Sequence, residues 1–195
     1  MVLVIDTSSS RSALALISDD GGATEDVVVD GREHDLPGRV MALVDPRRLT
    51  AVAVGLGPGS FTGLRVGVSY GVGLAMGLGI RLVGLSSLEL QAGRADEPVT
   101  ALVEAGRGRL YWQPPGGEPC LGDPVELPRG FPAVGWLRPA AAEAVEAAGV
   151  RLLSEEELKG FARAAAGLLG SAEALGYDTV ELKYMQSFRT MRERE

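Results

Sequence analysis

The chain has 195 residues, 46% of them hydrophobic, which suits one large folded domain or two small lobes and excludes a disordered protein. The formal net charge is −7 and the basic residues are scattered, so we do not expect the chain alone to bind nucleic acid. The longest apolar stretch, residues 66–80, is shorter than the about 20 residues of a membrane span, so no membrane association is expected. The single cysteine, Cys120, cannot form an internal disulfide, and Met1–Asp6 is typical of a strand rather than a signal peptide, which together favour a cytoplasmic location.

The first half of the chain predicts a β-meander followed by alternating helices and strands. The expected meander strands are joined by short turns, which force antiparallel pairing, and they cover residues 2–5, 13–17 and 27–29. A helix is expected to begin near Asp35, with Pro37 in its first turn, and to stop at Asp45 and Pro46. The elements that follow are a strand at 51–56, a long helix at 62–78, a strand at 81–85 and a short helix at 88–91. This order predicts an α/β protein with a mixed sheet covered by helices.

The second half is less regular. Two strands, at 99–104 and 109–113, are joined by a Gly-Arg-Gly turn, and residues 114–130 are rich in proline and glycine and read as a loop. A short helix is expected at 139–148, and Ser154 with Glu157 has the spacing of a capping box. The helix predicted after that box ends at Gly176 and carries one apolar stripe, made of Leu158, Phe161, Ala165, Leu168, Leu169, Ala172 and Leu175.

A glycine-rich loop at residues 55–67 joins a buried strand to the long helix. Such a loop can present backbone N–H groups to an anion. It is not a Walker loop, because no lysine follows the glycines, and it is not a dinucleotide fingerprint, because Ser60 stands where the third glycine belongs. Two interpretations stay open: an anion-binding loop, or a tight turn capped by Ser60 or Thr62.

The long helix carries glycine at every fourth position, at Gly63, Gly67 and Gly71. Each interior glycine lowers helix stability by about 1 kcal/mol relative to alanine, so the repetition requires a compensating close contact. Two partners could supply that contact: the protein's own sheet, or a helix of a second chain. The second hypothesis predicts an interface formed by Gly63, Gly67, Tyr70 and Gly71, together with Leu36 and Val40 of the preceding helix.

The sequence offers few catalytic candidates. His34 is the single histidine, so a two-histidine metal site cannot form, and no Cys-x-x-Cys pair exists for an ordinary zinc site. A catalytic triad would have to use His34, which sits at a helix start among charged residues, and Cys120 has no second histidine to activate it. We therefore expect no catalytic residue and no metal ligand in this chain.

Several segments together resemble the TsaB (YeaZ) family. They are Leu3-Val-Ile-Asp-Thr-Ser, Arg32-Glu-His, the loop Gly57-Pro-Gly-Ser-Phe-Thr-Gly-Leu-Arg-Val-Gly, Gly84-Leu-Ser-Ser-Leu and Leu110-Tyr-Trp. The clear resemblance covers about residues 1–113. It implies an actin/Hsp70/sugar-kinase-type (ribonuclease H-like) fold with an N-terminal lobe at 1–98 and an abbreviated lobe of the same type at 99–195. Glu104-Ala-Gly departs from the family's usual Asp-Ala-Arg, which leaves the role of residues 104–109 open.

The resemblance implies a non-catalytic subunit that supports a TsaD-type catalytic subunit, joined by a TsaE-type ATPase, in adding threonylcarbamoyl to the adenosine beside the anticodon of tRNAs. It implies a homodimer when the chain is alone, and contact with tRNA only through the complex. In active members of this fold the turn after the first strand binds phosphate and metal. A vestigial or shared nucleotide site would thus comprise Asp6, Thr7, Ser8, Gly57, Gly59 and Ser60, with no tightly bound cofactor but with room for ATP or ADP and Mg at a shared interface.

Two other classes of function compete with this one. The first is an autonomous ATP-dependent kinase or hydrolase of the same fold, against which stands the lack of a second glycine-rich phosphate turn in residues 99–195. The second is a self-assembling structural module built on the glycine-striped helix.

Overall fold

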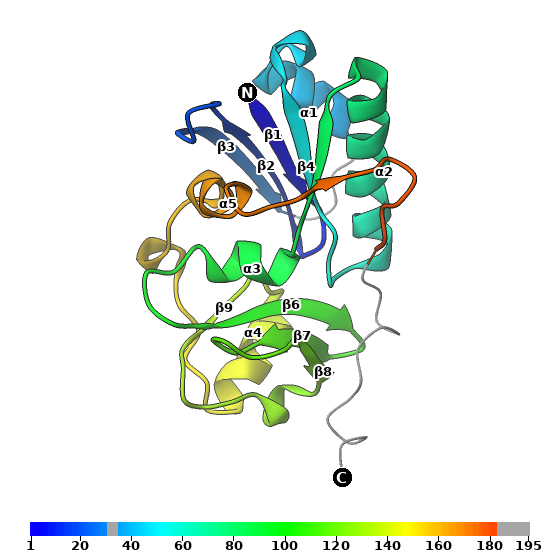
Figure 1. The fold of residues 1–195 in the computed structure, drawn as a ribbon. Helices are drawn as coiled ribbons and strands as arrows, with labels where there is room; N and C mark the ends of the chain where they lie inside the picture. The colour runs from blue at the N-terminus through cyan, green and yellow to red at the C-terminus, as the bar shows by residue number, and fades with distance from the viewer. Residues whose placement is uncertain (31–34, 183–195) are drawn as a thin grey trace.

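The computed structural model describes residues 1–30 and 35–182, which form two β-sheets placed one above the other in Figure 1. The upper sheet has the strand order β10-β5-β4-β1-β2-β3, and the lower sheet has the order β8-β7-β6-β9. The short helix α3 (Ser87–Ala92) lies between the two sheets (Figure 1). Within the described part of the chain, no helix is long and apolar enough to cross a membrane.

The upper sheet is mixed, as the meander pattern predicts. β1 (Val2–Asp6), β2 (Arg11–Ile17) and β3 (Ala23–Asp30) pair antiparallel. β4 (Ala51–Gly55) runs parallel to β1, and β5 (Arg81–Leu85) runs parallel to β4. The carboxyl ends of these three parallel strands therefore meet at one edge of the sheet.

Alternating side chains of the central strands face opposite layers of helices, as the two-residue period of a strand requires. Leu3, Ile5 and Val54 pack in one core with α1 (Leu36–Leu43) and α2 (Phe61–Leu78). Val4 and Ala53 pack in the opposite core with α5 (Phe161–Leu169). Helices thus cover both faces of the upper sheet.

The two helices of the first layer begin at the caps that the sequence predicts. The Asp35 side chain accepts a hydrogen bond from Gly38 N at 3.0 Å, and the Ser60 side chain accepts one from Gly63 N at 3.2 Å. α2 ends at Gly79, whose φ of 65° lies in the left-handed region that glycine adopts freely. The 3-10 turn Pro46–Arg48 follows α1, as Asp45-Pro46 predicts for the helix stop.

The lower sheet consists of β6 (Thr100–Gly106), β7 (Arg109–Gln113), β8 (Cys120–Gly122) and β9 (Ala133–Val134). One face packs on α3 through a cluster that includes Leu88 and Val103. The other face packs on α4 (Pro139–Ala147) through a cluster that includes Trp112 and Val145. β8 and the 3-10 turn Pro124–Glu126 lie inside 114–130, so the prediction that this stretch is only a loop is wrong for those residues.

Both predicted boundaries of the last helix are wrong. The capping box of Ser154 and Glu157 exists, but it caps only the 3-10 turn Glu155–Glu157. α5 begins after Gly160 and ends at Leu169, and β10 (Ala174–Leu175) is a strand paired with β5. The unpaired edge of β5 offers backbone hydrogen bonds that override the local helical pattern.

The chain therefore returns to the upper sheet after forming the lower one. α5 packs on β2 and β3, and β10 extends the upper sheet beyond β5 (Figure 1). The division into lobes at 1–98 and 99–195 stays a prediction, and residues 161–175 are structurally part of the upper layers.

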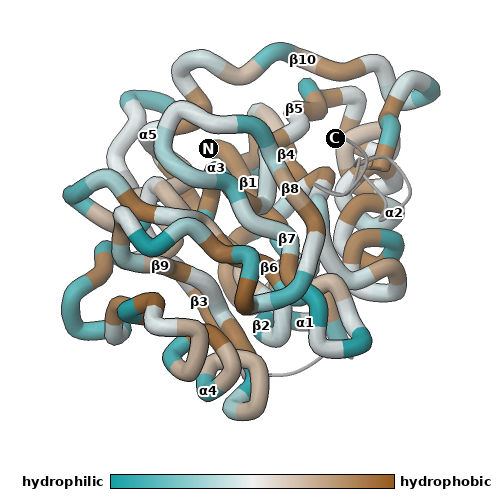
Figure 2. Tube along the Cα trace, turned by 90° about the horizontal axis from the view of Figure 1, so that it is seen from below, coloured by the Kyte–Doolittle hydropathy of each residue, from teal (hydrophilic) through white to brown (hydrophobic). Residues whose placement is uncertain are grey.

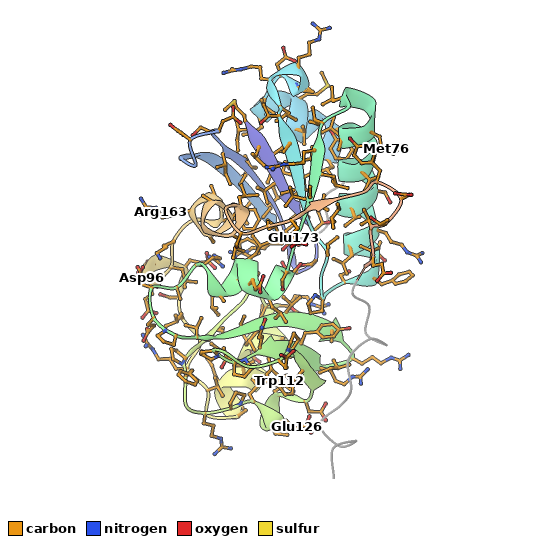
Figure 3. All side chains as sticks on the ribbon, in the orientation of Figure 1. Met76, Asp96, Trp112, Glu126, Arg163 and Glu173 are labelled. Carbon is orange, nitrogen blue, oxygen red and sulfur yellow. The ribbon has the colours of Figure 1, made fainter. Side chains whose placement is uncertain are left out.

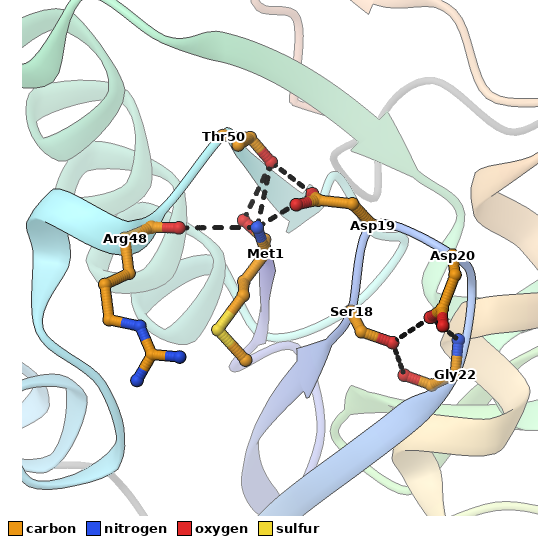
Figure 4. A network of polar contacts seen from close by, with 7 residues as sticks. All are labelled: Met1, Ser18, Asp19, Asp20, Gly22, Arg48 and Thr50. Atoms are coloured by element: carbon orange, nitrogen blue, oxygen red, sulfur yellow. Dashed lines mark hydrogen bonds and ion pairs between the residues drawn. The ribbon is translucent and has the colours of Figure 1, made fainter.

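A network of polar contacts lies at the end of the upper sheet where its parallel strands begin (Figure 4). The Met1 amino group donates to Asp19 at 2.7 Å and to Thr50 Oγ1 at 3.1 Å, and Thr50 Oγ1 donates to Asp19 at 2.6 Å. The hydrogen bond from the Met1 amino group, followed by the one from Thr50, lowers the pKa of Asp19 below its ordinary value. This network ties the β2–β3 turn to the start of β4, at the opposite end of the strands from the candidate site.

Candidate functional site

The turn after β1 lies at the edge where the parallel strands end. Asp6 is 2% exposed, and its Oδ1 accepts a hydrogen bond from Ser8 N at 2.8 Å and one from Ser87 Oγ at 3.4 Å. Its Oδ2 and the Ser8 hydroxyl have no hydrogen-bond partner among the described residues. Burial raises the pKa of Asp6 above its ordinary value of 3.8, although hydrogen bonds from Ser8 and Ser87 oppose the shift.

The glycine-rich loop packs directly onto this turn. Ser60 N donates to the Ser8 carbonyl at 2.7 Å, and Thr7 Oγ1 donates to the Gly63 carbonyl at 2.7 Å. A Cβ at Gly59 would overlap the Ser8 carbonyl oxygen, and one at Gly63 would overlap the Thr7 carbonyl oxygen. These glycines are required because the backbone of the turn occupies the space of a side chain.

The structure brings together the residues predicted to form a nucleotide site: Asp6, Thr7, Ser8, Gly57, Gly59 and Ser60. It places them in the interior, however, since all but Ser60 are buried. The amides of Ser60 and Gly63 are already bonded within the chain. This closed arrangement does not fit a nucleotide phosphate with its Mg, and it favours the interpretation of the loop as a turn capped by Ser60. Among the described residues, no group of three or more histidine, cysteine or acidic side chains could hold a metal ion.

The glycine stripe of α2 faces the protein's own sheet. A Cβ at Gly67 would overlap Thr7 Oγ1 and lie 3.4 Å from Ile5 Cγ2, and one at Gly71 would overlap Val54 Cγ1. The prediction that this groove receives a helix of a second chain is therefore wrong.

The companion residues of that predicted interface lie in the same core. Leu36 is 3% exposed, Val40 is fully buried, and Tyr70 is half-buried against the hydrophobic cluster of the upper sheet. The physical reason is the close approach of α2 to β1 and β4, which only small residues permit.

The opposite side of α2 is exposed and carries few polar groups. We call the outer α1–α2 face the set of exposed residues Met41, Ala42, Thr62, Val66, Ser69, Gly73, Met76 and Gly77. Met76 is 57% exposed and lies on the outer side of α2 (Figure 3). A Cβ at Gly73 or Gly77 would meet no atom within 4 Å. The signal for this face was present in the sequence, as a second set of small and apolar residues spaced by three or four positions.

Charge is almost absent from this helix. Arg65 is the single charged residue within Phe61–Leu78, and its guanidinium lies 3.8 Å from the centre of the Phe61 ring. Coloured by hydropathy, the α2 tube alternates between brown and paler segments (Figure 2). The outer α1–α2 face is thus a surface of small and apolar residues, and Arg65 is the one charged residue of α2.

Other candidate residues take structural positions. Glu104 is mostly buried and accepts hydrogen bonds from Arg138 N at 2.5 Å and from Arg138 Nε at 2.7 Å, which fixes the start of α4. The Cys120 thiol is half-buried and donates to the Glu118 carbonyl at 3.5 Å. His34 lies outside the described residues, as do the tail residues 183–195.

Comparison with known proteins finds similarity over part of the chain. The model of TsaD, the tRNA N6-adenosine threonylcarbamoyltransferase, matches residues 41–118. The tRNA threonylcarbamoyladenosine biosynthesis protein TsaB of Escherichia coli is 33% identical over 125 residues, covering 57% of this chain and 53% of that protein. TsaB of Bacillus subtilis is 32% identical over 122 residues, covering 56% and 52%. The chain thus spans about half the length of these curated relatives.

The fold has solved relatives. The structure of YeaZ from Pseudomonas aeruginosa matches with a TM-score of 0.71 at 22% identity, covering 94% of this chain and 99% of that one. A second structure, of a protein with similarity to the peptidase YeaZ, matches with a TM-score of 0.72 at 24% identity, covering 94% and 98%. The predicted fold class is confirmed, because the chain has the mixed α/β fold of these YeaZ structures, and the similarity to the TsaB proteins agrees with the resemblance seen in the sequence.

Proposed function

We propose that this chain is an accessory subunit in the synthesis of threonylcarbamoyladenosine in tRNA and works by supporting a TsaD-type catalytic subunit. The observation that carries the proposal is its similarity to proteins named for tRNA threonylcarbamoyladenosine biosynthesis. The net charge of −7 supports contact with tRNA only through the complex, and a role in tRNA modification supports a cytoplasmic location.

The chain itself is proposed to be non-catalytic. The closed packing of the Ser8 turn under Gly59 supports this role, because an ATP-dependent relative needs that turn open to phosphate. No cofactor is expected to bind tightly, and ATP or ADP with Mg would bind at a surface completed by the partner. The same packing argues against an autonomous ATP-dependent kinase or hydrolase.

The outer α1–α2 face is the proposed docking surface for the catalytic subunit. An α-helix of 18 residues extends for about 27 Å, long enough to pair with a helix along its length. Gly73 and Gly77 let another backbone approach closely, while Val66 and Met76 supply apolar area. When the catalytic subunit is absent, the same face would pair with a second copy of this chain, and a TsaE-type ATPase would join the assembled pair.

The test is co-purification with the TsaD homologue of the same organism, using two matched variants. Gly73→Leu fills the docking surface, and Gly167→Leu changes an exposed glycine of α5 that also has no atom near its missing Cβ. We expect wild type and Gly167→Leu to co-purify with the homologue, and Gly73→Leu to be lost from the complex while it stays folded. Equal retention of both variants would place the interface elsewhere, and no complex with wild type would contradict the proposed function.

A further inference from the structure

Four segments of the chain meet at a junction between the two sheets, centred on Arg94. The side chain of Arg94, which follows α3, is only 3% exposed. Its guanidinium donates to Gln91 Oε1 at 3.2 Å, forms an ion pair with Glu155, and lies 4.5 Å from the centre of the Trp136 ring. Arg94 is therefore a buried cation between α3, the β9–α4 connection and the turn that precedes α5.

Glu155 receives donors from three separate parts of the chain. Besides Arg94, it accepts a hydrogen bond from Trp136 Nε1 at 3.1 Å and pairs with Arg11 of β2 at 3.4 Å. One carboxylate thus links the upper sheet, the α3 layer and the chain that leaves the lower sheet.

Trp136 anchors the same junction through packing. It leaves the lower sheet after β9, is 3% exposed, and belongs to the core between the upper sheet and α5. Its ring lies 5.7 Å from that of Phe161, and its carbonyl accepts a hydrogen bond from Ser10 Oγ at 2.9 Å. A residue of the lower half is therefore inserted into the core of the upper half.

Electrostatics makes Glu155 the decisive member of this set. A guanidinium taken out of water is strongly unfavourable unless a carboxylate and hydrogen bonds compensate it. Contact with the Trp136 ring adds attraction but carries no negative charge. If the Glu155 carboxylate is neutralised, Arg94 keeps its charge but loses this negative partner, and leaving the junction restores its hydration.

We propose that Glu155, Arg94 and Trp136 form a latch that fixes the two sheets against each other. The latch makes the chain one rigid body, and loss of the Glu155 charge opens the junction while each sheet stays folded. Lys159, whose side chain pairs with Asp96 at 2.5 Å, reports on the latch, because its backbone N–H donates to the Arg94 carbonyl at 2.7 Å.

Hydrogen exchange of single backbone amides tests the latch. Glu155→Gln removes the charge at constant shape, and Glu156→Gln is the control, since this exposed neighbour changes charge equally. We expect the Arg94 and Lys159 amides to exchange at least about tenfold faster in Glu155→Gln than in the control, with amides of β1 and β6 unchanged. Equal rates in the two variants would overturn the proposal, as would an equal rise throughout both sheets.

A second variant tests the electrostatic reason. In Arg94→Met with Glu155→Gln, the buried cation is gone together with its carboxylate, so the apolar side chain can stay beside Trp136. We expect exchange at Lys159 in this double variant to return to within about threefold of the control. If the double variant exchanges as fast as Glu155→Gln alone, the burial of Arg94 is not what makes Glu155 a latch, and the proposal fails.

Discussion

Alanine at Gly67 tests which surface the glycine stripe of α2 contacts. The new Cβ would overlap Thr7 Oγ1 and lie 3.4 Å from Ile5 Cγ2. Displacing Thr7 removes its hydrogen bond to the Gly63 carbonyl, worth about 1 kcal/mol, and overpacking of a tight core adds about 1–3 kcal/mol. The gain in helix propensity offsets about 1 kcal/mol of this. We therefore expect Gly67→Ala to lower the free energy of unfolding by about 1–3 kcal/mol.

Gly73→Ala is the matched control, because Gly73 lies on the same helix, about 1.7 turns further along, with open space around it. It should raise the free energy of unfolding by about 0.5–1 kcal/mol through helix propensity alone. In a chain of this length each kcal/mol shifts Tm by about 2–4 °C. Thermal unfolding followed by circular dichroism would thus move the two variants in opposite directions. The reasoning is refuted if Gly67→Ala is as stable as Gly73→Ala.

Two further predictions concern buried carboxylates. Burial raises the pKa of Asp6, so the folded chain binds the carboxyl proton of Asp6 more tightly than the unfolded chain does. The stability that this proton contributes is fully present below the ordinary pKa of 3.8. It is lost as the pH rises through the pKa of the folded state. Asp6→Asn should therefore be more stable relative to wild type at pH 7 than at pH 4 in urea unfolding, and a difference independent of pH would contradict this. Glu104→Ala should lower the free energy of unfolding by about 1–2 kcal/mol, because the Arg138 amide loses its acceptor. Arg138→Ala changes an exposed side chain and should alter the free energy of unfolding by less than about 1 kcal/mol. Equal effects of the two substitutions would show that the hydrogen bond from the Arg138 backbone amide contributes nothing.

Local pattern was sufficient to predict most of the strands in both sheets. β5 and β7 have the predicted boundaries, since each apolar run is bounded by residues that end a strand. The helix starts at Asp35 and Ser60 were also predictable, because capping depends on chemistry within four residues. β10 was not predictable from the sequence, since two residues show no periodicity and form a strand only by pairing with β5.

The site was predictable in composition but not in orientation. The spacing of Gly63, Gly67 and Gly71 shows that something packs closely, yet a sheet of the same chain and a helix of another chain require the same small residues. The latch lay beyond any local signal, since Arg94 and Glu155 are 61 positions apart and neither stands in a motif. The orientation of the glycine stripe and the latch were missed for the same reason. Tertiary contacts between distant segments decide which face of a helix is buried.

Reconstitution of the modification tests the central claim most directly. The TsaD homologue, its TsaE-type ATPase, threonylcarbamoyl donor and tRNA would be incubated with and without this chain, and threonylcarbamoyladenosine would be measured by mass spectrometry of the digested tRNA. We predict product only when wild type or Gly167→Leu is present, and little or none with Gly73→Leu or with this chain lacking the catalytic subunit. Equal product without this chain, or product formed by this chain without the catalytic subunit, would contradict its role as a non-catalytic partner.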